Sequence, residues 1–226
     1  MFRQLFDPDS STYTYLLGDE SAGQAVIIDP VREHVERDLA LLGSHSLRLS
    51  WILETHVHAD HVTGARALRE RTGARTAVSL HCGASGFDQL LTDGDTVGFG
   101  AELIRAIATP GHTPGSTCYL WRDRLFTGDT LLIGGCGRTD FQSGDAGALY
   151  DSITLRLFCL PDDTLVYPGH DYRGRHVSTI GEEKATNPRL ASRSREDFIE
   201  IMSALGLPEP RRMRDAVPAN LQGGPP

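Results

Sequence analysis

Six short apolar runs, each bounded by glycine, proline or polar residues, predict β-strands. They cover residues 13–17, 25–28, 51–53, 103–108, 117–121 and 165–167. Residues 18–23 begin and end with glycine and join the first two runs, which predicts a hairpin. A glycine- and proline-rich turn at 109–115 separates the fourth run from the fifth.

Apolar residues at helical spacing predict two helices in the first half of the chain. The first has one apolar face, and Gly43 is placed to end it. That face consists of Val35, Leu39 and Leu42. The second is a surface helix over residues 61–71, stopped at Gly73. Strands and helices therefore alternate.

Two more helices are expected in the second half. One buries a face formed by Leu149, Ile153 and Leu157. The other opens with a capping box, Ser194 followed by Asp197. Its inward residues are Phe198, Ile201, Met202 and Leu205. Residues 211–226, rich in proline, glycine and arginine, are expected to form a loose or docked extension.

The composition indicates one ordinary globular unit. Hydrophobic residues make up 39% and charged residues 23% of the 226 residues, unlike a disordered chain. A chain of this length can form a single domain, so we expect one domain over residues 1–226 with a C-terminal extension from about residue 206.

Charge and hydropathy argue against a nucleic-acid partner and against a membrane span. The formal net charge is −8 and Lys184 is the one lysine, so no basic run could follow a nucleic-acid backbone. No apolar stretch approaches the ~20 residues of a membrane span, and the first residues lack a signal-peptide pattern, so we expect a cytoplasmic protein. The four cysteines lie far apart and are expected to be free thiols.

The densest chemistry follows the strand at 51–53, in the sequence THVHADH. It places His56, His58, Asp60 and His61 within six residues. His56 and His58 can share a metal only if the loop curls, because residues two apart on an extended chain point to opposite faces. Asp60 and His61 could then face a second, adjoining metal position. Imidazole and carboxylate suit zinc, iron or manganese. The alternative is a solvated histidine-rich loop.

Three distant residues repeat the pattern of a polar side chain at the end of a strand. His112 lies within PGHTPG, Asp129 follows FTG, and His170 follows YPG. The small residues let the backbone approach a metal closely. Each residue alone is typical of a turn, but together with the THVHADH cluster they predict one metal site.

The motifs THVHADH, GHTPGS, TGD and PGHD resemble the metal-binding motifs of the metallo-β-lactamase superfamily. They extend from about Thr55 to Asp171. The resemblance implies an αββα sandwich: two mixed β-sheets packed face to face, with helices outside and the metal site at one edge.

Within this superfamily, the chain resembles the persulfide dioxygenases related to the ethylmalonic encephalopathy protein. The resemblance spans nearly the whole chain, and GCGRTDFQ at residues 135–142 is its most specific part. It implies that glutathione persulfide is oxidised by O₂ to sulfite and glutathione at one non-haem iron(II) per chain. It also suggests a homodimer.

The resemblance assigns roles to the candidate residues. The iron ligands, which are also the catalytic residues, would be His56, His112 and Asp129, and this two-histidine, one-carboxylate set leaves positions open for substrates. A second shell or a vacant second metal position would be formed by His58, Asp60, His61 and His170. Zinc remains an alternative metal, because the same ligand types bind it.

Two alternatives use the same motifs. A glyoxalase II-like thioester hydrolase would bind two metals and activate a bridging hydroxide. Against it, only 56 residues follow His170, whereas the resemblance to glyoxalase II implies a longer helical C-terminal region. A non-catalytic thiol- or metal-binding module is the other alternative.

An arginine near the metal would suit the carboxylates of glutathione, because a guanidinium binds a carboxylate through two parallel hydrogen bonds. Arg138, in the glycine-flanked GCGRTDFQ loop, is the first candidate for substrate binding, and Tyr172 could contribute its hydroxyl. The alternative is that Arg138 pairs with Asp140 and braces the loop.

Overall fold

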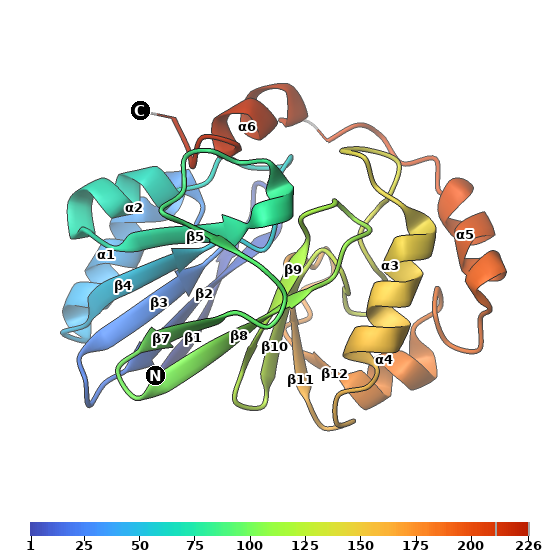
Figure 1. Ribbon diagram of the computed structural model, residues 1–226, viewed down its shortest axis with the longest axis horizontal. Helices are drawn as coiled ribbons and strands as arrows, with labels where there is room; N and C mark the ends of the chain where they lie inside the picture. Colours follow the sequence, from blue (N-terminus) through green and yellow to red (C-terminus); the bar gives the residue numbers. More distant parts are fainter. Residues whose placement is uncertain (211, 226) are drawn as a thin grey trace.

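The computed structural model describes every residue except Arg211 and Pro226. Two six-stranded sheets pack face to face (Figure 1). The first contains, in spatial order, β1 (Phe2–Asp7), β2 (Thr12–Asp19), β3 (Gln24–Ile28), β4 (Arg48–Leu53), β5 (Arg75–Ser79) and β6 (Gln89–Leu91). The second contains β12 (Ser178–Thr179), β11 (Leu165–Pro168), β10 (Arg124–Gly128), β9 (Thr117–Trp121), β8 (Glu102–Ala108) and β7 (Thr96–Phe99).

Both sheets are mixed. In the first, β1, β2 and β3 are antiparallel, whereas β3, β4, β5 and β6 run parallel. In the second, only the β10–β11 pair is parallel among the described pairs. The six predicted strands correspond to β2, β3, β4, β8, β9 and β11, and the predicted αββα sandwich is confirmed.

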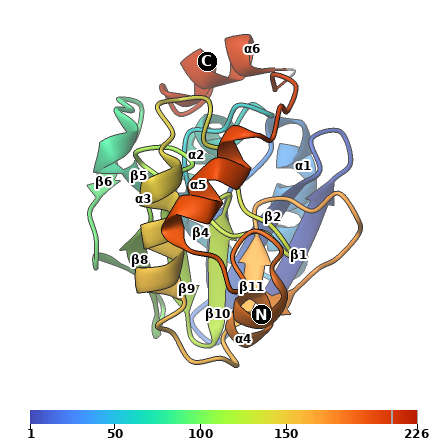
Figure 2. The ribbon, with the colours of Figure 1, turned by 90° about the vertical axis from the view of Figure 1, so that its right-hand side faces the viewer.

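Helices cover both outer faces of the sandwich (Figures 1 and 2). Against the first sheet lie α1 (Val35–Ser44) and α2 (Ala65–Thr72). Against the second lie α3 (Ala146–Ser152), a π-helical turn (Ile153–Leu157), α4 (Ile180–Thr186) and α5 (Arg195–Ser203). Two 3₁₀ turns, η1 (Arg32–His34) and η2 (Leu80–Cys82), and α6 (Met213–Asn220) complete the set.

Neighbouring residues of a strand pack into different cores, which explains why the strands are apolar throughout. Tyr15 and Leu17 of β2 face the core between the sheets, together with Phe126 from the second sheet. Leu16, between them, faces α1 and α2, where it packs near Leu42. A strand covered on both faces needs no polar side, so period-two alternation is absent from its sequence.

The structure corrects two helix boundaries. The first helix does not end at Gly43 but continues to Ser44, and Ser46 (φ 54°) takes the left-handed position after it. The second helix ends at Gly73 as predicted but begins at Ala65 rather than residue 61. Residues 62–64 pair with residues 30–32 instead: the Val62 carbonyl accepts from Arg32 N (2.9 Å), and Gly64 N donates to the Pro30 carbonyl (2.7 Å).

Other sequence predictions hold. The capping box of Ser194 and Asp197 opens α5, although Ile201 is only half-buried there. All four cysteines, which lie in the described part of the chain, are free thiols. Over that same part, no helix has the length and apolar character needed to cross a membrane.

Asp19, at the end of β2, fastens the first hairpin to the second sheet. Hydrogen bonds from the Ala101 backbone (2.9 Å), from Ser21 and from the Ala22 backbone lower the pKa of this carboxyl to about 2. A carboxyl with a lowered folded-state pKa stabilises the fold above its ordinary value of 3.8, and this stabilisation is lost as the pH falls towards 2.

We therefore expect Asp19→Asn to lower the melting temperature at neutral pH. Between pH 3.8 and about 2, the melting temperature of the variant should fall less steeply than that of wild type. Thermal melts followed by circular dichroism across this range test it, with the exposed neighbour Glu20→Gln as control. Parallel pH profiles for Asp19→Asn and wild type would contradict this assignment.

Candidate metal centre

The predicted site residues meet at one edge of the sandwich. His56 follows β4, His112 follows β8, Asp129 follows β10 and His170 follows β11. The positive φ of Gly128 (49°) turns the chain directly before Asp129. A Cβ at Gly128 would come within 2.5 Å of Thr55 Oγ1, so the close approach of two metal-site loops requires glycine there.

His56, His112 and Asp129 form one group. Each offers a ligand atom, and these atoms lie within 4.8 Å of one another. His112 Nε2 is 3.7 Å from Asp129 Oδ2, and the rings of His56 and His112 are 4.9 Å apart. Asp129 Oδ1 is buried and has no hydrogen-bond partner among the described residues.

The outer nitrogens of both histidines are engaged by the protein. His112 Nδ1 donates to the Arg138 carbonyl (2.7 Å), since a carbonyl can only accept. His56 Nδ1 lies 3.0 Å from Thr55 Oγ1, and that hydroxyl donates to Asp29 Oδ2 (2.8 Å), so it accepts from His56. Both rings therefore carry their free lone pair on Nε2, the arrangement that orients a metal-binding imidazole.

Burial, together with the nearby imidazoles of His58 and His112, holds the pKa of His56 well below its ordinary value. A neutral imidazole is the form that binds a metal. The three side chains thus present two imidazole lone pairs and a carboxylate to one point, and this donor set fits a divalent metal ion.

A second group of ligand atoms adjoins the first. It comprises His58, Asp60 and His61, again within 4.8 Å of one another. His61 Nδ1 lies 2.8 Å from Asp60 Oδ2, whereas His61 Nε2 is buried without a hydrogen-bond partner among the described residues. The loop curls as the sequence requires, because the rings of His56 and His58 lie 4.1 Å apart.

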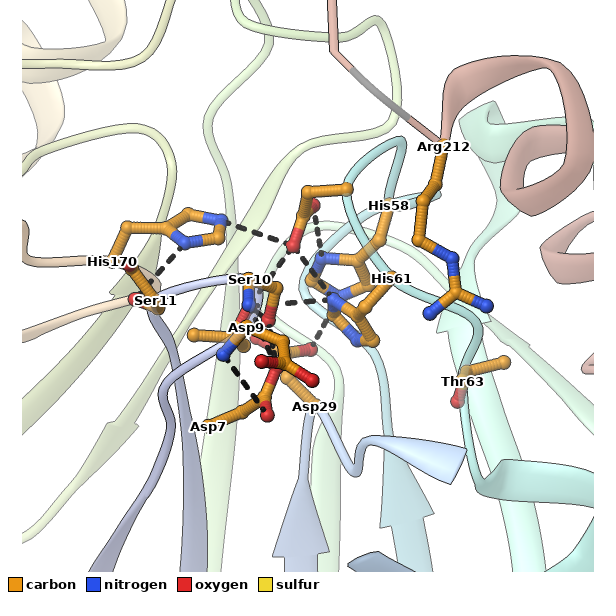
Figure 3. Close-up of polar contacts among 12 residues, drawn as sticks. Asp7, Asp9, Ser10, Ser11, Asp29, His58, His61, Thr63, His170 and Arg212 are labelled. Atoms are coloured by element: carbon orange, nitrogen blue, oxygen red, sulfur yellow. Dashed lines mark hydrogen bonds and ion pairs between the residues drawn. The ribbon is translucent and has the colours of Figure 1, made fainter. Parts of the chain in front are cut away.

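His170 lies between the two groups. Its Nε2 is 3.6 Å from both Asp60 Oδ2 and Asp129 Oδ1, and its Nδ1 faces the Ser11 carbonyl at 3.2 Å. Burial alone would lower the pKa of His170, but the carboxylates of Asp129 and Asp60 raise it to about 10. Figure 3 shows His170 on one side of the cluster and His58 and His61 on the other.

Sequence reasoning missed the buried acids beneath the loop. Asp29, 1% exposed, accepts from Thr55 N (2.7 Å) and Thr55 Oγ1. His58 Nε2 lies 3.1 Å from Asp29 Oδ1 and 3.3 Å from Glu54 Oε2. Burial would lower the pKa of His58, but these carboxylates raise it well above its ordinary value. The signal in the sequence was that Asp29 and Glu54 each directly follow an apolar strand.

The N-terminal strands also reach the site, a contact that the sequence did not reveal. Thr12 Oγ1 donates to Asp60 Oδ2 (2.9 Å), and Ser10 Oγ lies 2.7 Å from Thr12 Oγ1. Ser10 Oγ in turn donates to the carboxylate of Asp7 (Figure 3). The Asp7 carboxylate also lies 2.9 Å from His34 Nε2. A chain of polar side chains therefore fixes the carboxylate of Asp60.

The two predicted substrate-binding residues, Arg138 and Tyr172, differ from each other in their surroundings. Arg138 donates to both carboxylate oxygens of Asp140 (2.7 Å each). The ion pair that was considered as the alternative role of Arg138 is therefore present. It also donates to the carbonyls of Leu207 (3.0 Å) and Pro208 (2.6 Å). Tyr172 is 74% exposed and stacks on His170, with ring centroids 5.9 Å apart. Tyr172 is thus available to a ligand at the mouth of the site.

Comparison with known proteins agrees with this geometry. The family model for the metallo-beta-lactamase superfamily matches residues 7–170. The mitochondrial persulfide dioxygenase ETHE1 of Homo sapiens is 48% identical over 227 residues, which cover 99% of this chain and 89% of the human protein.

Solved structures give the same result. The crystal structure of ETHE1 from Myxococcus xanthus has a TM-score of 0.98 and 56% identity, with all of both chains covered. The protein TTHA1623, solved in a di-iron-bound form, has a TM-score of 0.71 and 28% identity, covering 84% of this chain and 100% of its own. The chain therefore belongs to the metallo-β-lactamase superfamily and, within it, to the persulfide dioxygenase family.

Proposed function

We propose that the protein is a persulfide dioxygenase that oxidises glutathione persulfide with O₂ to sulfite and glutathione at one iron(II) per chain. The observation that carries this proposal is the group of His56, His112 and Asp129, whose ligand atoms meet within 4.8 Å in a chain nearly half identical to the human enzyme. A two-histidine, one-carboxylate set with open positions is typical of non-haem iron oxygenases.

The overall reaction defines what the protein must handle. A persulfide, O₂ and water give a thiol, sulfite and two protons, so atoms and charge balance without another oxidant. Iron(II) bound by this set would supply adjacent sites for sulfur and O₂ and a path for electrons between them. The residues around it must hold the ligands in place, position the persulfide and receive the released protons.

The surrounding residues suit these tasks. The Arg138 carbonyl and the Asp29–Thr55 pair fix the rings of His112 and His56 through their Nδ1 atoms. His170 Nε2, between two carboxylates, can hold a proton beside the reacting atoms. In this proposal four residues do not bind the iron but orient its ligands and set the electrostatic potential of the site: His58, Asp60, His61 and His170.

Tyr172 and Arg138 are the candidate substrate contacts. Tyr172 stacks over His170 with most of its side chain exposed, so a persulfide entering the site would contact it first. Arg138 as the carboxylate anchor stays a prediction, and its contacts with Asp140, Leu207 and Pro208 show that it also braces the loop. A homodimer, a cytoplasmic location and the single domain over residues 1–226 likewise stay predictions.

The second candidate is a thioester hydrolase with two metals. The observation that favours it is the adjoining group of His58, Asp60 and His61, which could hold a second ion. The similar protein TTHA1623 has been solved with two irons, so the fold accommodates two. The two candidates differ in metal count, in the metal that supports activity and in oxygen consumption.

Purified under iron-replete conditions, the protein should contain about one iron per chain, because the first set presents two imidazole lone pairs and a carboxylate, whereas in the second group His58 faces Asp29 and Glu54 and Asp60 accepts from Thr12. Elemental analysis measures the count, and an oxygen electrode measures uptake with glutathione persulfide. Replacement of the iron by zinc should abolish uptake, since zinc has no redox chemistry. Two tightly held zinc ions with thioester hydrolysis and no oxygen uptake would establish the second candidate instead.

A further inference from the structure

The superfamily model matches residues 7–170. The chain that follows these residues contacts the loops of the candidate metal centre. After α5 the chain passes over the edge of the sandwich that carries the site and reaches α6, beside α2 (Figures 1 and 2). We call residues 204–210 and 212–225 the C-terminal strap.

Asn220, the last residue of α6, makes the central contact. Its Nδ2 donates to the carbonyls of His58 and His61, both at 2.9 Å, and its Oδ1 accepts from Thr63 N at 2.9 Å. The side chain is 2% exposed, so water does not replace these bonds. Both amide hydrogens and the amide oxygen are used, which no other side chain of this size can match.

The loop needs these partners because its backbone is irregular. Residues 54–64, between β4 and α2, carry His56 and the second group of donors but form neither helix nor strand. Buried carbonyls outside regular structure require hydrogen bonds from elsewhere. Asn220 supplies them at His58 and His61, one on each side of Asp60 in the sequence, so its amide fixes the curl of the loop.

Further contacts set the register of the strap. Arg66 N in the first turn of α2 donates to the Gly223 carbonyl, and Ser85 N donates to the Leu221 carbonyl, both at 2.9 Å. Gly86 lies so close to the strap that a Cβ there would come within 1.9 Å of the Gln222 carbonyl oxygen. The strap therefore docks in one position, with Asn220 under the loop.

The N-terminal end of the strap contacts Arg138, whose backbone carbonyl accepts from His112. Arg138 donates to the carbonyls of Leu207 and Pro208, and its own carbonyl accepts from His112 Nδ1. In Figure 3, Arg212 at the base of α6 lies beside the loop that carries His58, His61 and Thr63. The strap thus spans the backbone elements that orient His56 and His112.

We propose that Asn220 is a positioning residue for the metal centre: through its three hydrogen bonds, the C-terminal strap holds loop 54–64 in its metal-binding shape and slows release of the metal. The inference rests on the proposed function for the existence of the metal centre. It adds a residue from outside the superfamily motifs to the machinery that retains the ion.

Asn220→Asp tests this with almost no change of size. The new carboxylate keeps an acceptor for Thr63 N but sets an oxygen against the carbonyls of His58 and His61, where two donors stood. Release of iron(II) from the full chain to an excess of a coloured chelator should accelerate about 10–100-fold, by analogy with the loss of metal affinity when an outer contact of a metal site is removed. The visible spectrum of the cobalt(II)-loaded variant should also change, because it reports ligand geometry.

Asn187→Asp is the matched control. Asn187 is equally buried and donates to the Gly135 carbonyl (3.0 Å) and Glu183 (2.7 Å) rather than to the metal loop. It should lose thermal stability while iron release and the cobalt spectrum stay like wild type. Equal acceleration in both variants, or none in Asn220→Asp, would overturn the proposal. Asn220→Ser, which loses the reach of the amide without adding charge, serves if Asn220→Asp does not fold. Wild-type protein that holds no metal would instead overturn the proposed function.

Discussion

Replacing His112 with alanine should leave the purified protein without iron and without oxygen uptake. His112 supplies one of two imidazole lone pairs to the candidate centre, and its Nε2 faces Asp129 at 3.7 Å. Removal of one protein ligand from three leaves the ion held by two side chains, so both metal content and activity are lost together. His56→Ala and Asp129→Ala should behave in the same way.

His170→Ala separates ligands from their supporting residues. His170 contacts Asp60 and Asp129 but is not part of the three-residue group, so we expect a milder loss of about 10–100-fold in iron affinity or activity. His45→Ala, a partly exposed histidine paired with Glu20, is the control and should match wild type. Elemental analysis and oxygen uptake measure the series. Iron lost as completely from His170→Ala as from His112→Ala would place His170 among the ligands.

Asp29→Asn should lower the free energy of unfolding of the metal-free protein by about 3 kcal/mol, because it breaks a buried ion pair and leaves Glu54 as the remaining carboxylate beside His58 Nε2. Asp29 is 1% exposed and lies 3.1 Å from His58 Nε2, whose pKa the neighbouring carboxylates raise. Asparagine keeps the size and tolerates the positive φ of 51° at this position. Urea unfolding of the metal-free proteins measures the difference.

Asp38→Asn is the comparison for this variant. Asp38 is 0% exposed and pairs with Arg37 Nε at 2.9 Å, but burial raises the pKa of its carboxyl, so its charged form is disfavoured in the fold. Its replacement should therefore cost less than that of Asp29. A loss at Asp29 no larger than at Asp38 would show that the charge on Asp29 contributes little to stability.

The sequence pattern predicted correctly those elements that depend on interactions between residues close together in the chain. The capping box at Ser194 opens α5, and the hairpin of residues 13–28 forms as expected. The start of α2 was wrong by four residues, because the Pro30 carbonyl and the Arg32 amide engage residues 62–64. Val62, Thr63 and Gly64 are themselves poor helix formers, so intrinsic propensity agrees with the later start of α2.

The same distinction applies to the candidate site. His56, His112 and Asp129 were visible because each follows a strand and lies in a segment that resembles a known motif. Asn220 was not, because an asparagine in a proline-containing C-terminal helix has no local signal for contacts 157 to 162 residues away. Arg138 was recognised, but its partners Leu207 and Pro208 depend on the path of the strap.

The separation between Asn220 and the loop also affects how the protein is made. The ribosome synthesises His58 162 residues before Asn220, at about 5–20 residues per second. For roughly 8 to 30 seconds the nascent chain therefore carries the histidine-rich loop with the carbonyls of His58 and His61 still lacking their amide donors. From the proposed role of Asn220, we expect metal bound in this interval to exchange readily and long-lived capture to follow only after the strap has emerged and docked.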